Sequence, residues 1–341
     1  MDVGGGHVTA ALIDPASVGD VLVERGAPVD PHAERDALLE QLAAPGRVLA
    51  EHETLAGWSI AMPGPFDAAA GTGTFAGVDK FQSLAGIDLR AALADRLGVA
   101  PGAVRFVNDA VAYGIGEWAS GAGVGAHRMI CVTLGTGVGS AFLVGGEEVR
   151  SGPTVPEAGE VHRLTIDGRP LEETISSPAI RRADRARSGR ERTVEEICAA
   201  ARAGDRGARE VVSSAMRALG VALRPWAERF AADRVVVGGS IARSWDVIEA
   251  PLRAGLTLDT HGATHPPTNE STHPPTNEST HPPTNVSTHP PTNVSTHAPT
   301  NESTHAPTHP PTGVVRAALG SRAPLVGAAM AWASGTRPLS R

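Results

Sequence analysis

A glycine-rich turn near the middle of the chain has the residue types that bind phosphate. It reads Thr-Leu-Gly-Thr-Gly-Val-Gly-Ser over residues 133–140, with an apolar run on each side. Alternating glycines, Gly135 and Gly137 among them, let backbone N–H groups converge on an anion, and the hydroxyls of Thr133, Thr136 and Ser140 add donors. An apolar strand rather than a helix follows, so neither a dinucleotide fingerprint nor a P-loop fits. A phosphate-binding hairpin and an ordinary glycine-rich hairpin are the two interpretations.

The first residues of the chain offer a second phosphate turn and a candidate metal ligand. Asp2 precedes a run of three glycines that begins with Gly4 and Gly5, and Val8–Ile13 is expected to be a strand. The Asp2 carboxylate could hold Mg²⁺, directly or through water, while the glycine N–H groups approach the phosphate. A plain turn shares this short pattern. Because only Met1 precedes Asp2, we expect either a start further upstream or a truncated domain edge.

A carboxylate at the end of a short buried strand is the candidate catalytic group. Residues 104–107 predict this strand, Asn108 and Asp109 follow it, and 110–119 predict a helix. Proteins with alternating strands and helices place their chemistry at such strand ends. The alternative role for this pair is a helix N-cap, for which Asp is well suited. The local pattern supports both roles.

Acidic residues and a histidine gather after the central hairpin. Glu157, Glu160 and His162 lie close together, and Glu172 follows further along. Solvated surface charge is the usual explanation for such a cluster. A later junction, Gly238-Gly239-Ser240, ends another expected buried strand and could let a flat ring lie close to the backbone.

The segments between these candidates predict regular elements that would position them. Periodicity predicts strands at 57–62 and 234–237. Helices are expected at 34–50, 87–97, 193–204, 205–230 and 241–252. Thr193 and Glu196 match a capping box, and we expect the helix at 205–230 to be kinked or broken before Pro225. Small apolar residues at 327–329 suit close helix packing.

Length and composition restrict the possible classes of protein. With 341 residues, the chain exceeds what one hydrophobic core usually organises, so two domains are expected. A formal net charge of −7 argues against nucleic acid as the main partner. No apolar run suggests a membrane span, and no leader indicates secretion, so a cytoplasmic location is expected. Cys131 and Cys198 cannot build a zinc site by themselves and are expected to be buried free thiols.

Residues 264–312 differ from the rest of the chain. The octapeptide Thr-His-Pro-Pro-Thr-Asn-Glu-Ser recurs there with small variations. The tract is rich in proline and nearly lacks apolar side chains, so we expect a solvated, polyproline-like surface excursion. Successive histidines would lie about 25 Å apart when extended, too far to share one metal ion. No function is assigned to the repeats.

The order of these motifs resembles the ROK family of sugar kinases, which belongs to the actin-like ATPase superfamily. The resemblance covers nearly the whole chain outside 264–312, and the segments 105–142 and 234–242 are its specific parts. It implies two α/β lobes of ribonuclease-H-like type with an interlobe cleft. Residues 1–108 would form the small N-terminal lobe, 109–263 and 313–341 the large C-terminal lobe, and 264–312 a disordered, low-complexity repeat insertion.

The resemblance also implies roles for individual residues. Asp109 matches the general base that takes the proton from the sugar hydroxyl attacking the γ-phosphate, a reaction that needs positioning more than a strong base. Asn108 matches a sugar contact, and Asp2 matches the residue near Mg²⁺. Glu172 matches a glutamate that hydrogen-bonds the sugar. Gly64 and Lys80 lie in small-lobe loops beside the sugar, although a surface position is favoured for Lys80. The nucleotide-binding positions would be Gly4, Gly5, Thr133, Gly135, Thr136, Gly137, Gly238 and Gly239.

The chain departs from the usual family pattern around the zinc loop. Where Glu-x-Gly-His is usual, residues 157–160 read Glu-Ala-Gly-Glu; with a shifted alignment, Glu160 and His162 take the two roles instead. A sugar contact from Glu157 or Glu160 is expected, and the choice between them stays open. No cysteine lies between Gly159 and Glu172, so no structural zinc is expected. Gly6 and His7 stand where Thr and Lys are common.

The leading hypothesis is therefore an ATP- and Mg²⁺-dependent kinase of a hexose or amino sugar, with glucokinase-like activity. The sugar, and the choice between ATP and polyphosphate as donor, stay open. The alternative is a non-catalytic sugar-binding or regulatory ROK homologue; a transcription regulator would need a helix-turn-helix domain before the first glycine turn. Neither nucleic acid nor membrane is expected as a partner. The oligomeric state stays open, with a homodimer as one alternative because family members are often dimers.

Overall fold

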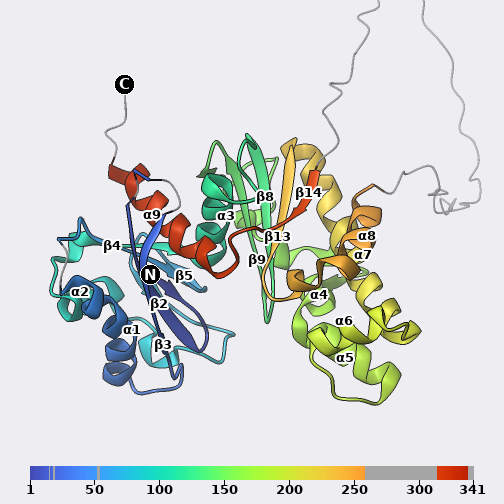
Figure 1. The fold of residues 1–341 in the computed structure, drawn as a ribbon, viewed down its shortest axis with the longest axis horizontal. Coiled ribbons are helices and arrows are strands. Elements are labelled where there is room, and N and C mark those ends of the chain that lie inside the picture. Colours follow the sequence, from blue (N-terminus) through green and yellow to red (C-terminus); the bar gives the residue numbers. More distant parts are fainter. Residues whose placement is uncertain (15, 18–19, 52–53, 258–312, 337–341) are drawn as a thin grey trace, which may run out of the picture. The chain divides into compact units, whose positions relative to one another are not determined.

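Two five-stranded sheets organise the computed structural model, which describes residues 1–14, 16–17, 20–51, 54–257 and 313–336 (Figure 1). The first sheet has the order β3-β2-β1-β4-β7 and the second has the order β10-β9-β8-β13-β14. The strands of the first sheet are β1 (Asp2–Val3), β2 (His7–Ile13), β3 (Val21–Pro28), β4 (Trp58–Met62) and β7 (Val104–Asn108). Those of the second are β8 (Arg128–Leu134), β9 (Val138–Val144), β10 (Glu147–Glu148), β13 (Arg234–Gly238) and β14 (Gly313–Arg316).

The two sheets have the same internal arrangement. In the first, β1, β2 and β3 are antiparallel, whereas β1, β4 and β7 run parallel. In the second, β8, β9 and β10 are antiparallel, whereas β8, β13 and β14 run parallel. Each sheet therefore has a central strand that turns back through a hairpin on one side and has parallel neighbours on the other.

Separate hydrophobic clusters cover the two sheets. Figure 1 shows α1 (Arg35–Ala50) and α2 (Leu89–Leu97) beside the first sheet, where Leu38, Leu42 and Leu93 are buried with Val3 and Val8 of the strands. The second sheet packs with the helical layer that follows it, through residues such as Leu219, Leu223 and Ile130. That layer contains α4 (Glu172–Ile175), α5 (Ser177–Ser188), α6 (Val194–Arg202), α7 (Arg206–Phe230) and α8 (Trp245–Leu256).

Short elements connect these layers. Two small ribbons pair β5 (Phe66–Asp67) with β6 (Thr72–Gly73), and β11 (Thr165–Ile166) with β12 (Arg169–Pro170). The 3₁₀ turns are η1 (Gln82–Leu84), η2 (Pro101–Ala103), η3 (Glu157–Gly159), η4 (Val161–Arg163), η5 (Ile241–Ser244) and η6 (Gly320–Arg322).

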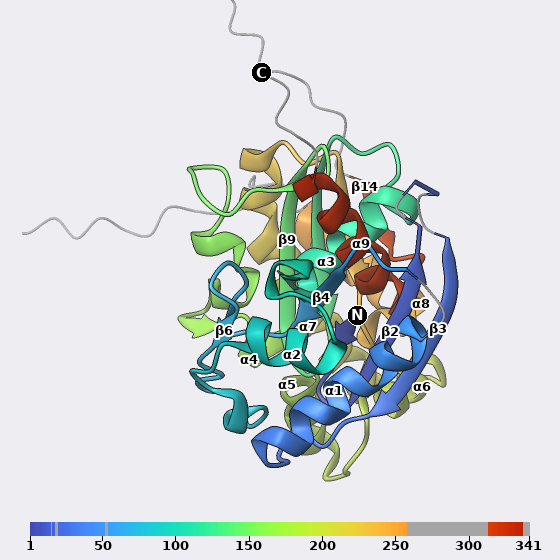
Figure 2. The same cartoon turned by 90° about the vertical axis from the view of Figure 1, so that its left-hand side faces the viewer.

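Helices α3 (Asp109–Ser120) and α9 (Ala323–Thr336) lie side by side in both ribbon views (Figure 2). Helix α3 follows the first sheet but contacts β8 and β9 of the second, whereas α9 follows the second sheet but contacts β2 and β4 of the first. Their close approach needs glycine. A Cβ on Gly116 would overlap the carbonyl oxygen of Ala323, and one on Gly327 would overlap that of Ala112.

The structure confirms the α/β class and most of the expected elements. The N-terminal hairpin, the central hairpin, the strand before Asn108 and the Thr193–Glu196 capping box all form. The expected close packing at Gly327 also forms. The lobe boundaries stay predictions; β14 belongs to the second sheet, whereas α9 contacts the first.

Of the kink or break expected before Pro225, the break is wrong, because α7 is one helix from Arg206 to Phe230, and the kink stays a prediction. An internal proline costs about 3 kcal/mol. Buried side chains on both sides of it, Leu219 and Leu223 before and Ala227 and Phe230 after, hold the helix against the core and offset that cost. The repeat tract at 264–312 lies outside the described residues.

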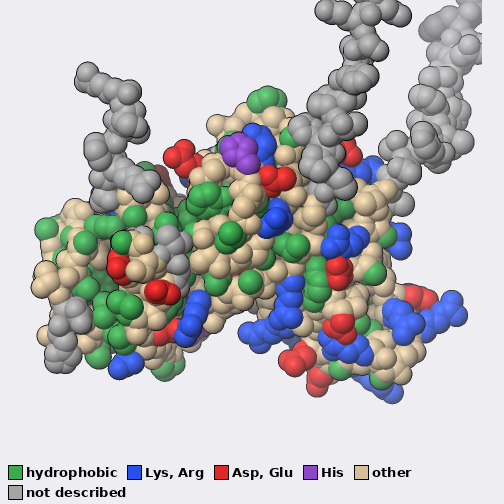
Figure 3. Space-filling model, turned by 45° about the horizontal axis from the view of Figure 1, so that its top comes forward, with side chains coloured by type: hydrophobic (Ala, Val, Ile, Leu, Met, Phe, Trp, Pro, Cys, Tyr) green, Lys and Arg blue, Asp and Glu red, His purple; other side chains and the backbone are tan. Residues whose placement is uncertain are grey.

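The described surface carries mixed charge. On the face drawn in Figure 3, basic side chains lie next to acidic ones. Ion pairs such as Arg202–Asp246 and Arg253–Glu249 join the helices of the second half or stabilise a single helix. Among the described residues, no helix combines the length and apolar character needed to cross a membrane.

Candidate active site

Asn108 and Asp109 lie at the junction between β7 and α3. Only one of them, Asn108, is the helix N-cap. Asn108 is the N-cap: its Oδ1 accepts hydrogen bonds from the N–H groups of Ala110, at 3.0 Å, and Val111, at 3.2 Å. Asp109 is the first helical residue, and its Oδ1 accepts from Ala110 N at 2.8 Å. Because Asn108 supplies the cap, Asp109 is not needed for it.

The capping bond also fixes which way the Asn108 amide points. With Oδ1 held by the helix, the Nδ2 group lies 4.0 Å from the position that a Cβ on Gly64 would occupy. The parallel pairing of β4 with β7, in which Met62 lies opposite Asn108, brings these two segments together. The two N–H donors at Nδ2 therefore lie near the Gly64 loop, and the sugar contacts expected of both residues stay predictions.

Two carboxylates, Asp2 and Asp109, lie close enough to influence each other. Burial raises the pKa of Asp109 to about 6, and the negative charge of Asp2 adds to this rise, while the hydrogen bond from Ala110 opposes it. Burial also raises the pKa of Asp2, against the opposing effects of the N-terminal ammonium and His7. A partly desolvated carboxylate with a pKa near neutrality is suited to accept a proton.

The first glycine turn connects Asp2 to the strand β2. Gly4 N donates to the carbonyl oxygen of His7 at 2.9 Å, which closes the turn. The His7 ring covers Gly4, since an added Cβ would lie 2.6 Å from its Cε1. Gly5 packs against the end of the Lys80 side chain. Backbone and imidazole therefore meet here beside Asp2.

The second glycine turn joins β8 to β9 beside the start of α3. Gly135 N donates to Gly137 O at 3.0 Å, and Thr136 is exposed at the tip. At the base of the hairpin, a Cβ on Gly139 would lie 2.6 Å from both the Thr133 Oγ1 and the Ala110 Cβ atoms. The absence of that Cβ brings the hairpin against the residue that follows Asp109.

Glu172 lies at this second turn. Its Oε1 accepts a hydrogen bond from Val138 N at 2.9 Å, and a Cβ on Gly137 would lie 3.0 Å from the same oxygen. The contact shows how α4 is joined to the hairpin. The sugar contact expected for Glu172 stays a prediction, with the second carboxylate oxygen as its available acceptor.

The acidic loop at 157–163 is fastened to β9 by a hydroxyl group. Ser140 Oγ donates to Gly159 O at 2.7 Å and accepts from Val161 N at 2.9 Å, and Val161 is fully buried. Hydrogen bonding and packing therefore hold this loop. The Ser140 hydroxyl, considered above as a phosphate donor, serves this purpose instead.

The three site candidates in that loop, Glu157, Glu160 and His162, interact mainly with its own charges. Glu160 Oε2 lies 2.8 Å from Arg163 Nε and 3.9 Å from His162 Nε2, and the exposed Glu157 lies 3.9 Å from the Arg163 guanidinium. Which glutamate faces a sugar stays open. Within the described ranges, no group of three or more His, Cys, Asp or Glu side chains could hold a metal ion.

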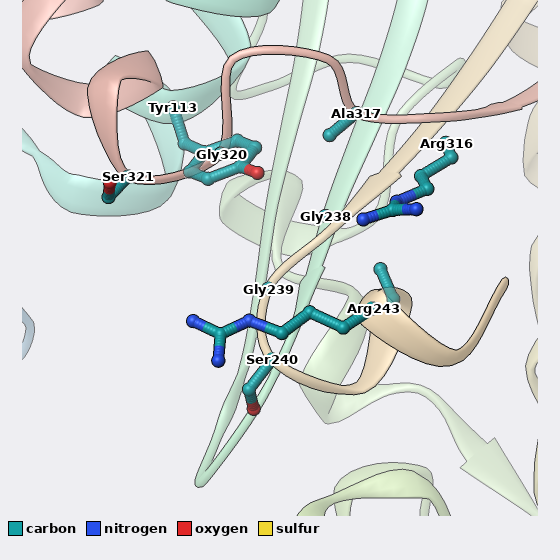
Figure 4. A pocket seen from close by; sticks show the side chains of 10 residues that line it. Tyr113, Gly238, Gly239, Ser240, Arg243, Arg316, Ala317, Gly320 and Ser321 are labelled. Carbon is teal, nitrogen blue, oxygen red and sulfur yellow. The ribbon is translucent and has the colours of Figure 1, made fainter. Parts of the chain in front are cut away.

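A pocket of about 240 Å³ lies at the Gly238-Gly239 junction (Figure 4). A Cβ on Gly238 would lie 2.5 Å from the Tyr113 ring, so the flat ring that the glycine accommodates is the chain's own tyrosine. Figure 4 shows Tyr113 on one side of the pocket and Arg243 with Ser240 on the other. Gly239 has a φ of +84° and its Cα packs on the backbone of Leu134, and Ser240 Oγ lies 3.6 Å from a Cβ position on Gly135. The pocket therefore adjoins the second glycine turn.

Several pocket residues were not identified from the sequence. Tyr113 lies within a predicted helix, and Arg243, Arg316 and Ser321 carry no motif. Ser240 belongs to the Gly238-Gly239-Ser240 junction that the sequence predicted. Gly320, which has a φ of +59°, lies in a turn that was not predicted. Only the packing of α3 and the segment after β14 against β13 brings these residues together.

The curated relatives of the chain include two glucokinases. The glucokinase of Thermotoga maritima is 27% identical over 282 residues, which cover 74% of this chain and 84% of that protein. Two other curated relatives, one of them a glucokinase, are matched over only 24% and 51% of their own length.

Solved structures share the fold at low identity. A ROK family glucokinase from Streptomyces griseus, solved with glucose and AMPPNP, has a TM-score of 0.66 and 21% identity, with 96% of each chain covered. A ROK family transcriptional regulator has a TM-score of 0.69 and 19% identity, with 97% of this chain and 76% of that chain covered. The profile of the ROK family matches residues 1–262. The chain therefore belongs to the ROK family.

Proposed function

We propose that this protein transfers the γ-phosphoryl group of ATP to a hydroxyl group of a hexose or amino sugar, with Asp109 as the general base. The observation that carries the proposal is the position and state of Asp109. Its carboxylate begins α3, adjoins the second glycine turn through Ala110 and has a pKa raised to about 6 by burial. The glucokinase relatives support the same chemistry.

In this mechanism the sugar hydroxyl attacks the γ-phosphorus. A bond forms between that oxygen and phosphorus, the bond from phosphorus to the β,γ-bridging oxygen breaks, and ADP leaves with the bond's electron pair. The hydroxyl proton passes to Asp109. The Asn108 Nδ2 group orients the sugar from the side of Gly64. Positioning and charge neutralisation are the main requirements of phosphoryl transfer.

The pair of carboxylates suits a divalent cation. The charge of Asp2 disfavours ionisation of Asp109, and a cation held between the two carboxylates would relieve that repulsion. Mg²⁺ prefers hard oxygen ligands of this kind. Asp2 would hold the ion, directly or through water. When bound, Mg²⁺ would neutralise phosphate charge. The glycines of the two turns would offer their N–H groups to the phosphates, and the pocket at Gly238 and Gly239 would receive the nucleoside.

The test is an ADP-release assay with glucose, N-acetylglucosamine, N-acetylmannosamine, mannose and fructose, with ATP or polyphosphate as donor. We expect Asp109→Ala to lower kcat by about a thousandfold or more while the circular dichroism spectrum stays native. The control is Asp95→Ala, which removes an exposed carboxylate from α2. Undiminished turnover by Asp109→Ala would refute the assigned role.

A second candidate is a sugar-binding protein without turnover. The regulator with a similar fold motivates it, together with Gly6 and His7 in the first turn. Calorimetric titration with each sugar, and separately with ATP, distinguishes the two functions. Sugar binding by the wild-type protein without ADP release in any assay would favour the second candidate.

A further inference from the structure

The first glycine turn is contacted by a lysine from a distant segment. Lys80 is the only lysine in the 341-residue sequence. A Cβ added to Gly5 would overlap its Nζ atom and would lie 3.0 Å from Cε and 3.1 Å from Cδ. The end of the side chain therefore lies along the backbone of the turn, and the residue as a whole is half-exposed.

The loop that carries Lys80 is anchored on both sides. Phe75 and Phe81 are buried in the first core with ring centroids 5.8 Å apart, and Phe81 N donates to Pro31 O at 2.9 Å. The Gln82 side-chain amide closes the loop by donating hydrogen bonds to Phe75 O at 2.7 Å and to Val78 O at 2.6 Å. Since Lys80 immediately precedes a fixed aromatic residue, its side chain starts from a defined place.

Among the described residues, the Lys80 ammonium forms no ion pair or hydrogen bond that would explain its position. A side chain with four methylenes loses considerable rotamer entropy when it is held against a backbone. An ammonium group held at the Cα of Gly5, on the same turn as Asp2, places a positive charge at a glycine turn of the kind that binds phosphate.

We propose that Lys80 contacts the phosphoryl group during its transfer, together with the first glycine turn. The inference rests on the proposed kinase function and adds a catalytic residue to it. The ammonium would attract the equatorial oxygens of the phosphoryl group while its bond to ADP breaks and its bond to the sugar oxygen forms. Lys80 keeps its proton throughout, and the proton of the sugar hydroxyl goes to Asp109.

Two other roles for Lys80 make different predictions. A lysine that binds the sugar would affect the KM of the sugar, and a lysine that only fills space above Gly5 would be replaced well by methionine. A lysine that binds the phosphoryl group affects kcat and the affinity for a nucleotide with a γ-phosphate, but not the affinity for ADP. The charge at the turn, rather than the volume of the side chain, decides these effects.

The experiment compares Lys80→Met, Lys80→Arg and the control Arg25→Met, which removes a positive charge from an exposed position on β3. Steady-state kinetics give kcat and both KM values, and calorimetry gives the affinities for AMPPNP and ADP with Mg²⁺. We expect Lys80→Met to lower kcat by about a hundredfold, as the loss of one transition-state donor does. Its affinity for AMPPNP should fall to that for ADP, with an unchanged sugar KM. Lys80→Arg should recover part of both losses.

Two glycine variants test the contact without removing the charge. Gly5→Ala would displace the ammonium, whereas the added Cβ of Gly6→Ala meets open space, so Gly5→Ala should lose more kcat. The inference is overturned if Lys80→Met matches the wild type in kcat and AMPPNP affinity, or if only the sugar KM changes. If the wild type phosphorylates no sugar, the proposed function fails. In that case the affinities for AMPPNP and ADP still test the inference. A wild-type protein that binds AMPPNP no more tightly than ADP overturns it, as does a Lys80→Met variant that keeps the wild-type preference for AMPPNP.

Discussion

The first glycine turn joins β1 to β2, the second joins β8 to β9, and in both sheets the entering strand is the central one. Asp2 and Thr133 occupy equivalent positions, opposite Thr9 and Gly139. A backbone hydrogen bond closes each turn. The side chains of His7 and Lys80 also pack on the first turn, whereas at the second Glu172 accepts the N–H of Val138.

This difference suggests a division of labour between two turns of the same topology. The first turn carries charged and titratable groups that can act on a reacting phosphate. The second turn is held by fixed hydrogen bonds and adjoins the pocket at Gly238 and Gly239, which suits a part of the nucleotide that does not react. Catalysis gains from groups that act on developing charge, whereas binding needs only fixed geometry.

The same duplication extends to the helices α3 and α9, each of which follows one sheet and packs on the other. The largest expected effect comes from Gly327→Ala, which disrupts the packing of α3 against α9. The added Cβ would overlap the Ala112 carbonyl oxygen and lie 2.6 Å from its carbon, so the helices must separate. We expect the free energy of unfolding to fall by about 3 kcal/mol, measured by urea denaturation.

The matched control is Gly335→Ala on the same helix. Its added Cβ meets only a side chain, the Arg105 guanidinium at 2.5 Å from Nη1, and not a backbone atom. Moving that group costs at most its hydrogen bond to Trp332 O and its contact with the Trp332 ring, so Gly335→Ala should lose clearly less stability than Gly327→Ala. Equal stability of the two variants would show that α3 and α9 do not depend on this close contact.

The carboxylate pair belongs to the first half only, since Thr133 replaces the equivalent of Asp2 in the second. The raised pKa of Asp109 in the free protein predicts a kcat/KM for the sugar that falls about tenfold per pH unit below about pH 6 and is constant above it. The folded protein holds this proton more tightly than the unfolded chain, whose pKa is near 3.8. The resulting stability is present below about pH 4 and is lost as the pH rises through about 6.

Asp109→Asn cannot titrate and keeps an acceptor for Ala110 N. It should match the wild-type stability at about pH 4 and exceed it by about 2 kcal/mol at about pH 8, after allowance for partial solvent screening. Thermal unfolding across that range measures the difference. A constant difference at all pH values would mean that Asp109 has an ordinary pKa in the folded protein.

The sequence was sufficient wherever the deciding chemistry was local. Alternating apolar and glycine residues predicted the central hairpin, a strand followed by Asn108-Asp109 predicted the start of α3, and Thr193 with Glu196 predicted a capping box. In each of these places the residues that form the feature are neighbours in the chain. The order of the motifs then gave the family, which the profile match over 1–262 confirms.

Contacts between distant segments could not be predicted in this way. Lys80 reaches Gly5, Tyr113 covers Gly238, and Glu172 holds Val138, and in every case two loops or elements must first be placed by their cores. The continuity of α7 also depends on contacts with distant segments, because the burial of side chains on both sides of Pro225 offsets the local cost of a proline inside a helix. Such contacts decide which side chains surround each turn, although the turns themselves are visible in the sequence.

The smallest expected effect concerns the anchor of the second turn. Glu172→Ala removes the acceptor of the Val138 N–H, so the unfolding free energy should fall by about 1 kcal/mol, whereas Glu173→Ala removes only an exposed neighbour. Glu172→Gln keeps an acceptor oxygen and should restore most of the stability. If Glu172→Ala is as stable as Glu173→Ala but raises the sugar KM, Glu172 belongs to the sugar site and the second turn needs no side chain. If stability falls and the sugar KM is unchanged, the second turn, like the first, is contacted by a charged side chain from outside its hairpin, but there the contact is a hydrogen bond that holds the turn.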